Sequence, residues 1–294
     1  MALVKIITDS CSDMTKELRD RYDIDYAQMR TVYQGKETPA SLDFEYYSPK
    51  QLYDIMRNGE RVTTTQVPQE EFDRVFKMYL EQGMDIVYVG CSLKLSSSVN
   101  TGTMVARRLM DAYPGREIYC VDSMNACMGE GLIAMRAAEY RDQGLSAHDI
   151  VEKLLPERNF CNQFCTVQTL DFLKKAGRVT ASSAFFGNLL GVKPIIISDK
   201  NGNNTAIKKV KGRMSSMKEI VNMMKEAITD PENATIYLGH ADCIEDAEEL
   251  KAMVKEAIPC KDVYTFIIGP IIGASCGPDT IVLYAWGKEV TFAG

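Results

Sequence analysis

Apolar residues in the first half of the chain alternate between short continuous runs and stretches with helical spacing. The continuous runs predict buried strands at Val4–Thr8, Asp85–Gly90 and Glu117–Asp122. Strands separated by helices of ten to twenty residues are typical of βαβ units, so this half is predicted to form a parallel sheet. The predicted helices are Thr15–Tyr22, Pro49–Asn58, Gln69–Gln82, Ser98–Tyr113 and Asn125–Gln143.

The second half has a different pattern, and the change falls near Pro156. The turn Asp199–Asn204 carries a hairpin signal, which predicts antiparallel pairing and therefore a mixed sheet. We predict an α/β protein with two lobes, 1–157 and 158–294, and lobe interfaces favour ligand sites. The predicted strands and helices of this half are Asn159–Val167, Lys193–Ser198, Thr235–Gly239, Val263–Ile268, Thr280–Trp286, Met217–Ala227 and Glu245–Ile258.

Hydroxyl side chains gather in four loops next to predicted strands or helices. In a parallel sheet the carboxyl ends of the strands share one edge, where ligands bind. Hydroxyls together with helix N-termini suit an anion such as a carboxylate or phosphate. A single such loop is better explained by helix capping or turn formation, but four together on one edge slightly favour an anion site. The loops are Thr8–Ser10, Ser92 with Ser96–Ser98, Asp122–Ser123 and Thr63–Gln66.

Charge and cysteine content narrow the class of protein. The net charge of −6 disfavours nucleic acid as a main partner. No signal peptide is recognised, and no apolar run approaches the roughly 18 residues that a membrane span needs. The nine cysteines lie mostly in apolar runs, so we expect free buried thiols, a reducing cytoplasm and no stable membrane anchor; transient membrane contact stays open.

Metal or cofactor binding is not predicted. The closest cysteine pair, Cys161 and Cys165, has no second pair to complete four ligands. The chain has only two histidines, His148 and His240. It also lacks a P-loop and a G-x-G-x-x-G motif after a strand, so ATP would have to be bound by another chain.

Two enzymatic or ligand alternatives stay open. Ser96 or Cys91 would be the nucleophile of an acyl hydrolase or transferase, with His240 as its base, although no G-x-S-x-G elbow is present. A carrier of another amphipathic acid is the second alternative.

The glycine-rich run Ile267–Asp279 would either line a ligand tunnel or connect core strands tightly.

Several short motifs, in order along nearly the whole chain, resemble the DegV family of bacterial fatty-acid-binding proteins, which includes the FakB-type subunits of fatty acid kinase. The most specific block is Leu173–Pro194, similar to the family's L-x-x-G-G-R-I through K-P-I run. The other matches are Thr8–Ser10 to T-D-S, Thr64–Gln66 to T-S-Q, Leu95–Ser98 to L-S-G-T, and Val121–Ser123 to V-D-S.

The resemblance implies two α/β lobes with an acyl chain in a tunnel between them. It places the carboxylate on the hydroxyls of Thr64, Thr65 and Ser96, with Ser92 as a helper. Ser275 stands where the family has a histidine, and Asp279 replaces the last glycine of the family's G-x-H-x-G-P-G pattern. Candidate lining residues for the acyl chain are Phe164, Phe185, Phe186, Leu189, Ile271 and Ile272.

The resemblance also implies a partner. In the family, an ATP-binding kinase subunit phosphorylates the bound carboxylate for phospholipid metabolism. We therefore expect a lipid-binding subunit with no catalytic residues of its own. The basic residues Arg178, Lys211 and Arg213 are predicted to face the kinase, although such charges are also common on a solvated surface.

Overall fold

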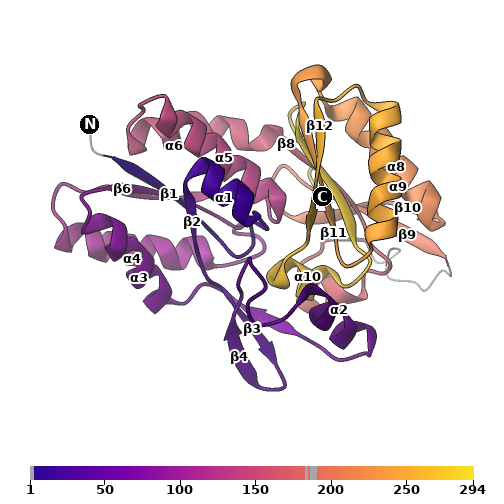
Figure 1. The fold of residues 1–294 in the computed structure, drawn as a ribbon, viewed down its shortest axis with the longest axis horizontal. Coiled ribbons are helices and arrows are strands. Elements are labelled where there is room, and N and C mark those ends of the chain that lie inside the picture. Colours follow the sequence, from indigo (N-terminus) through magenta and orange to yellow (C-terminus); the bar gives the residue numbers. More distant parts are fainter. Residues whose placement is uncertain (1–2, 183–184, 186–190) are drawn as a thin grey trace.

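Two sheets organise the chain, which the computed structural model describes over residues 3–182, 185 and 191–294. Each sheet belongs to one lobe, and the lobes lie side by side (Figure 1). This is the two-lobed α/β architecture expected from the sequence.

The first lobe is built on a four-stranded parallel sheet with the order β2-β1-β6-β7. Every residue of β1 and β6 is buried, because helices cover both faces of the sheet. Helices α3 and α4 pack on one face, and α1, α5 and α6 on the other (Figure 1). The elements are β1 (Val4–Asp9), α1 (Lys16–Tyr22), β2 (Ile24–Ala27), α3 (Gln69–Leu80), β6 (Asp85–Gly90), α4 (Ser98–Ala112), β7 (Ile118–Asp122), α5 (Met128–Asp142) and α6 (Ala147–Glu157).

A small antiparallel sheet, β4-β3-β5, extends below this lobe (Figure 1). It consists of β3 (Arg30–Tyr33), β4 (Lys36–Pro39) and β5 (Thr63–Thr65), and helix α2 (Pro49–Arg57) lies between β4 and β5 in the chain. The turn at Gln34-Gly35 has positive φ at both residues, as tight hairpin turns require. The sequence analysis missed β2, β3 and β4 because each is only four residues long and none is fully buried.

The second lobe contains the predicted mixed sheet, with six strands in the order β10-β9-β8-β13-β11-β12. Only β11 and β12 pair in parallel, and the predicted hairpin joins β9 to β10. Helices α8 and α9 cover its outer face, while α5 of the first lobe contacts β8 and β13. The elements are β8 (Cys161–Thr166), β9 (Val192–Ser198), β10 (Asn204–Lys211), α8 (Arg213–Ala227), β11 (Thr235–His240), α9 (Ile244–Ala257), β12 (Asp262–Ile267) and β13 (Ile281–Trp286), with 3-10 turns η1 (Arg158–Phe160) and η3 (Pro231–Asn233).

Two segments that were not predicted to be helical contain short helices. The run Ile267–Asp279 forms α10 (Pro270–Cys276), which begins with proline at its first position. The basic turn near Gly177 follows α7 (Asp171–Ala176), and Gly177 ends that helix in the left-handed conformation with φ of 70°. Pro156, the boundary signal, lies in the last turn of α6.

The lobes are joined by a hydrophobic core that includes residues of both sheets. Polar contacts made by Tyr53, Asp13 and Arg57 reinforce this interface. The Tyr53 hydroxyl donates to the carbonyl of Ile268 at 2.8 Å, and the Gly269 N–H donates to Oδ1 of Asp13 at 3.0 Å. Arg57 of α2 pairs with Asp242 at 2.5 Å and Asp279 at 2.8 Å. The first lobe is therefore fixed to both ends of the α10 segment.

Replacing Tyr53 by phenylalanine should destabilise the protein by about 1–3 kcal/mol, because a buried carbonyl loses its donor. Urea denaturation followed by circular dichroism measures the effect. Tyr46→Phe is the control, since half of that side chain is exposed. Equal midpoints for the two variants would contradict the importance of this contact.

Candidate ligand-binding site

A cavity lies where the strand ends of the first lobe meet α10 and the inner face of the second sheet. It holds about 1000 Å³ of space free of protein atoms, its open mouth included. Both lobes contribute to its wall, so the cavity exists only in the assembled chain. Its polar lining includes Thr64, Thr65, Gln66, Ser96, Ser97, Gln163, Arg178, Asn204, Ser275, Thr280 and Tyr284.

Four of the predicted carboxylate-binding residues line this cavity, namely Thr64, Thr65, Ser96 and Ser275. Thr64 and Ser275 also line a smaller neighbouring cavity, as does Arg178. The polar end of the site therefore lies where the two cavities meet. The Thr65 hydroxyl donates to Glu37 at 3.1 Å, so it is already engaged.

Hydrogen bonds hold the two hydroxyl loops together. The N–H of Val67, just after β5, donates to Oγ of Ser98 at 3.2 Å, and the Gln66 side-chain amide donates to Thr101 at 2.8 Å. Ser98 and Thr101 belong to the first turn of α4. The threonines of β5 are thereby fixed beside the N-terminus of α4, where free N–H groups favour an anion.

Arg178 is a site residue that the sequence analysis assigned to another role. It was predicted only as a docking residue, yet it lines both cavities. Gly177 turns the chain after α7, and Nε of Arg178 donates to the carbonyl of Leu95 at 2.9 Å. This bond places the guanidinium next to the Ser96 loop. The glycine–arginine turn was a signal that could have revealed this position.

Ser275 and Asp279, the two departures from the family pattern, occupy different surroundings. The Ser275 hydroxyl lies on α10 at the cavity and donates to the carbonyl of Ile271 at 3.2 Å. Asp279 does not line the cavity, and its carboxylate accepts from Arg57 at the lobe interface. Asp279 therefore places no negative charge on the cavity wall.

The predicted apolar lining is only partly correct. Ile271 and Ile272 line the cavity. Phe164 does not line this cavity, because it points to the other face of β8 and belongs to the outer core beneath α8. Phe185 packs against the interlobe core under the ammonium group of Lys209 and does not line the cavity. Phe186 and Leu189 lie outside the described residues.

Thiols form much of the remaining wall, which the sequence analysis did not anticipate. Burial raises the pKa of Cys127 well above its ordinary value and that of Cys276 to about 12, so these side chains are neutral. Neutral thiols act as small polarisable apolar groups. The lining thiols are Cys11, Cys91, Cys127, Cys165 and Cys276.

The other predicted hydroxyls on the sheet edge stabilise loops instead. Ser92 is fully buried and donates to the carbonyl of Gly202 at 2.7 Å, so its helper role was wrong. The Thr8 hydroxyl donates to Glu130 at 2.7 Å, and Ser123 donates to the carbonyl of Asn125. None of these three lines the cavity.

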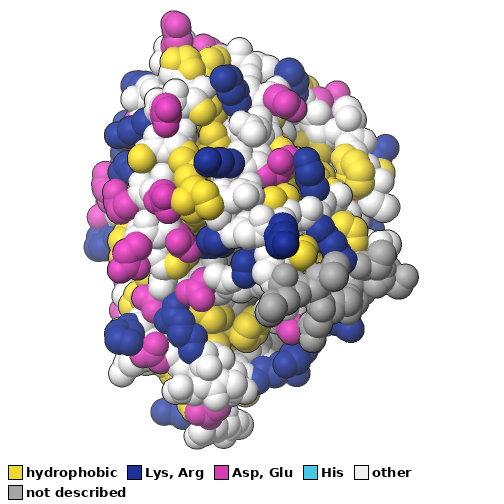
Figure 2. Space-filling model, turned by 90° about the vertical axis from the view of Figure 1, so that its right-hand side faces the viewer, with side chains coloured by type: hydrophobic (Ala, Val, Ile, Leu, Met, Phe, Trp, Pro, Cys, Tyr) yellow, Lys and Arg dark blue, Asp and Glu magenta, His cyan; other side chains and the backbone are white. Residues whose placement is uncertain are grey.

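Lys211 and Arg213, the other two basic residues predicted to face a kinase, differ in how they are engaged. Lys211 is exposed at the end of β10, whereas Nε of Arg213 donates to Asp246 at 2.8 Å and ties α8 to α9. Basic and acidic side chains both occur on the face shown in Figure 2, where several basic side chains lie near its centre.

Ser96 and His240, the nucleophile and base of the hydrolase alternative, are engaged in other contacts. Nδ1 of His240 accepts from the backbone of Cys243 at 3.3 Å, and burial lowers the pKa of this histidine. His240 does not line the cavity, while the Ser96 hydroxyl lies 3.0 Å from that of Ser98. The proposed nucleophile and base are therefore not brought together.

Among the described residues, no helix has the length and apolar character needed to cross a membrane.

Comparison with known proteins assigns the chain to a family. The pattern described as "Uncharacterised protein, DegV family" matches residues 3–286. This chain belongs to the DegV family. A DegV domain-containing protein of Clostridium perfringens is 33% identical over 282 residues, covering 96% of this chain and 97% of that protein.

Solved DegV structures share the fold. The structure described as fatty acid binding of a DegV family protein from Thermus thermophilus has a TM-score of 0.87 and 26% identity, covering 97% of this chain and 99% of that one. A DegV lipid-binding protein of Thermotoga maritima has a TM-score of 0.85 at 24% identity, covering 99% and 100% of the two chains. The two-lobed architecture is therefore that of the DegV family.

The buried carboxyl of Asp13 gives the interface a pH dependence. Burial raises its pKa from 3.8 to about 8, against the opposing hydrogen bond from Gly269. The contribution of Asp13 to stability is then greatest below pH 3.8 and is lost as the pH rises to about 8, by up to about 1.4 kcal/mol per pH unit. Asparagine keeps the neutral shape and tolerates the φ of 50° found at Asp13.

We expect Asp13→Asn to flatten the fall in unfolding free energy between about pH 4 and 8. Urea denaturation at a series of pH values measures the slope. Asp111→Asn, an exposed position on α4, should leave the slope unchanged. A slope that is the same in both variants would show that Asp13 is ionised in the folded protein.

Proposed function

We propose that this DegV protein binds one long-chain fatty acid in the cavity between its lobes. The observation that carries this proposal is the cavity itself, which has hydroxyls and one guanidinium on one side and isoleucines, thiols and a few polar side chains such as Gln163 and Tyr284 elsewhere. Such a wall suits a molecule with one anionic end and a long apolar body. The fatty-acid-binding DegV protein of Thermus thermophilus supports the same ligand class.

The carboxylate is proposed to bind at Thr64, Ser96 and Ser275, with Arg178 beside it and Thr65 supporting the loop. Hydroxyl donors stabilise a carboxylate at a low desolvation cost, since they are neutral before the ligand arrives. The N-terminal turn of α4 adds a partial positive charge. Arg178 supplies the formal charge that the family histidine position, here Ser275, does not.

The acyl chain supplies most of the binding free energy. Each buried methylene contributes about 0.8 kcal/mol, so about 14 of them give roughly 11 kcal/mol before costs. Ordering the chain and desolvating the head group offset several kcal/mol of this. Tight binding is therefore compatible with a head-group site built mainly from hydroxyls.

We further propose that the chain is not an enzyme by itself and presents its ligand to an ATP-binding kinase subunit in the cytoplasm. Its sequence carries no P-loop, so the nucleotide must come with a partner. The exposed Arg178 and Lys211 offer positive charge near the cavity mouth and at the end of β10. Acyl phosphate made this way would enter phospholipid synthesis.

Fatty acid binding is tested by extracting the purified protein with organic solvent and by titrating it with a fluorescent long-chain fatty acid. A stoichiometric fatty acid in the extract is expected. Ser96→Ala and Arg178→Gln should each weaken binding about tenfold, as loss of a charge-assisted hydrogen bond predicts. Ser215→Ala, an exposed hydroxyl on α8, is the matched control. An empty extract with no uptake would refute the proposal.

The kinase role is tested separately with the loaded protein, ATP and a purified ATP-binding fatty acid kinase subunit. Lys211→Glu should lower the rate of acyl phosphate formation severalfold without changing fatty acid affinity, since repulsion would weaken docking. Lys225→Glu, exposed on α8, controls for charge alone. If wild-type protein yields no acyl phosphate, the presenting role is wrong while lipid binding stands.

A further inference from the structure

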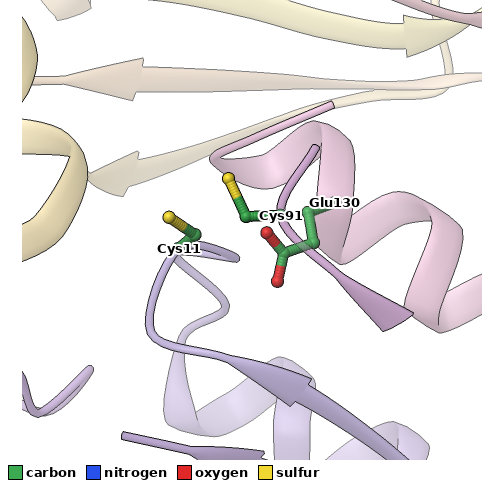
Figure 3. A group of neighbouring side chains, drawn as sticks. All are labelled: Cys11, Cys91 and Glu130. Atoms are coloured by element: carbon green, nitrogen blue, oxygen red, sulfur yellow. The ribbon is translucent and has the colours of Figure 1, made fainter. Parts of the chain in front are cut away.

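Three ligand-type side chains meet beside the cavity, outside the proposed carboxylate site. Cys11 lies two residues beyond the end of β1, Cys91 follows β6 directly, and Glu130 is in the first turn of α5. Figure 3 shows the two sulfur atoms and the carboxylate gathered where these elements converge. One ligand atom from each lies within 4.8 Å of the other two, and all three residues are buried.

A single carboxylate positions both thiols. Oδ1 of Asp9 accepts from the backbone N–H of Cys11 at 2.8 Å, and Oδ2 accepts from that of Cys91 at 3.3 Å. The Tyr88 hydroxyl donates to the same Oδ2 at 2.6 Å. Asp9 therefore fixes the relative placement of the two cysteine backbones, as supporting groups do around bound metals.

Glu130 has one oxygen that the fold leaves unused. Its Oε1 accepts from the Thr8 hydroxyl at 2.7 Å and from the N–H of Asp9 at 3.3 Å. Within the described part of the chain, its Oε2 has no hydrogen-bond partner, although the side chain is fully buried. A buried oxygen without a partner costs free energy, so a ligand at this point would relieve that cost.

We propose that Cys11, Cys91 and Glu130 bind a zinc-class divalent cation. Zinc takes sulfur ligands at about 2.3 Å and oxygen at about 2.0–2.2 Å in a tetrahedron, which sets sulfur atoms about 3.8 Å apart. The ligand atoms lie within 4.8 Å of one another, so binding would draw them closer together. Cys11 and Cys91 also line the cavity, so the fourth position opens toward it.

The charge balance of the site favours this class of metal. All three side chains are buried, so a cation bound here would have to be balanced by its own ligands. Binding through both Sγ atoms and Oε2 of Glu130 releases the proton of every ligand atom that carries one, and the two thiolates then balance the charge of the divalent cation in a buried setting. Soft thiolates exclude magnesium and calcium, which prefer oxygen ligands.

The experiment titrates the reduced full-length protein with Cd²⁺ and follows the ultraviolet thiolate-to-metal charge-transfer band, then competes with Zn²⁺. Wild type should bind one high-affinity equivalent, more tightly at higher pH. The Cys11→Ser, Cys91→Ser double variant should lose that equivalent. Glu130→Gln, which keeps both thiols, should weaken binding about 10–100-fold. Cys260→Ser, a partly exposed cysteine of the second lobe, should change nothing.

Three results would overturn the proposal. The first is no cation uptake by the reduced protein. The second is an equivalent of unchanged affinity in the double variant. The third is a wild-type protein that forms a Cys11–Cys91 disulfide in air yet binds no cation once reduced. Circular dichroism checks that each variant folds, and if the serine variants do not, Glu130→Gln decides the question. None of these measurements depends on the fatty acid.

Discussion

Packing between the two lobes is the constraint on which the rest of the molecule depends. The first sheet and the second sheet contribute to one hydrophobic core, and the polar contacts of Tyr53, Asp13 and Arg57 hold that core to the segment carrying α10. Because the parallel strands end against this segment, a cavity remains between strand ends, helix and second sheet. Small rearrangements at the interface would change the cavity wall directly, since close-packed interiors transmit strain.

The polarity of the cavity follows from its burial. Burial disfavours the charged forms of ionisable groups, and it raises the pKa of the lining residues Cys127 and Cys276 and of the nearby carboxyls of Asp13 and Glu130. Among the lining residues formal charge is confined to Arg178, which is exposed at the mouth and donates to the carbonyl oxygens of Leu95 and Ala176. An amphipathic acid, with one charged end and a long apolar body, matches this change in polarity along the cavity. The thiol and carboxyl cluster at Cys11, Cys91 and Glu130 lies within the same wall, where a cation would need two thiolates to balance it.

Much of the candidate site could be predicted, but residue type alone did not separate ligand-facing hydroxyls from structural ones. Thr64 and Ser96 line the cavity, while Ser92, only four residues before Ser96, is turned toward Gly202. Phe164 and its neighbour Cys165 alternate across β8, so one lies in the outer core and the other in the cavity. Successive residues of a strand point to opposite faces, so a difference of one position decides whether a side chain lies in the cavity or in the outer core. The sequence does not determine which face of a central strand points toward the cavity.

The sequence by itself determined the long buried strands and most of the longer helices, the mixed character of the second sheet and the family motifs, because these depend on periodicity and turn chemistry between near neighbours. Only the tertiary structure decided that Asp279 pairs with Arg57, that Arg178 lies at the cavity mouth, and that Cys11 meets Cys91 and Glu130. Those juxtapositions join residues tens to hundreds of positions apart. They depend on how the lobes and strand ends pack in space, which local patterns along a chain do not encode.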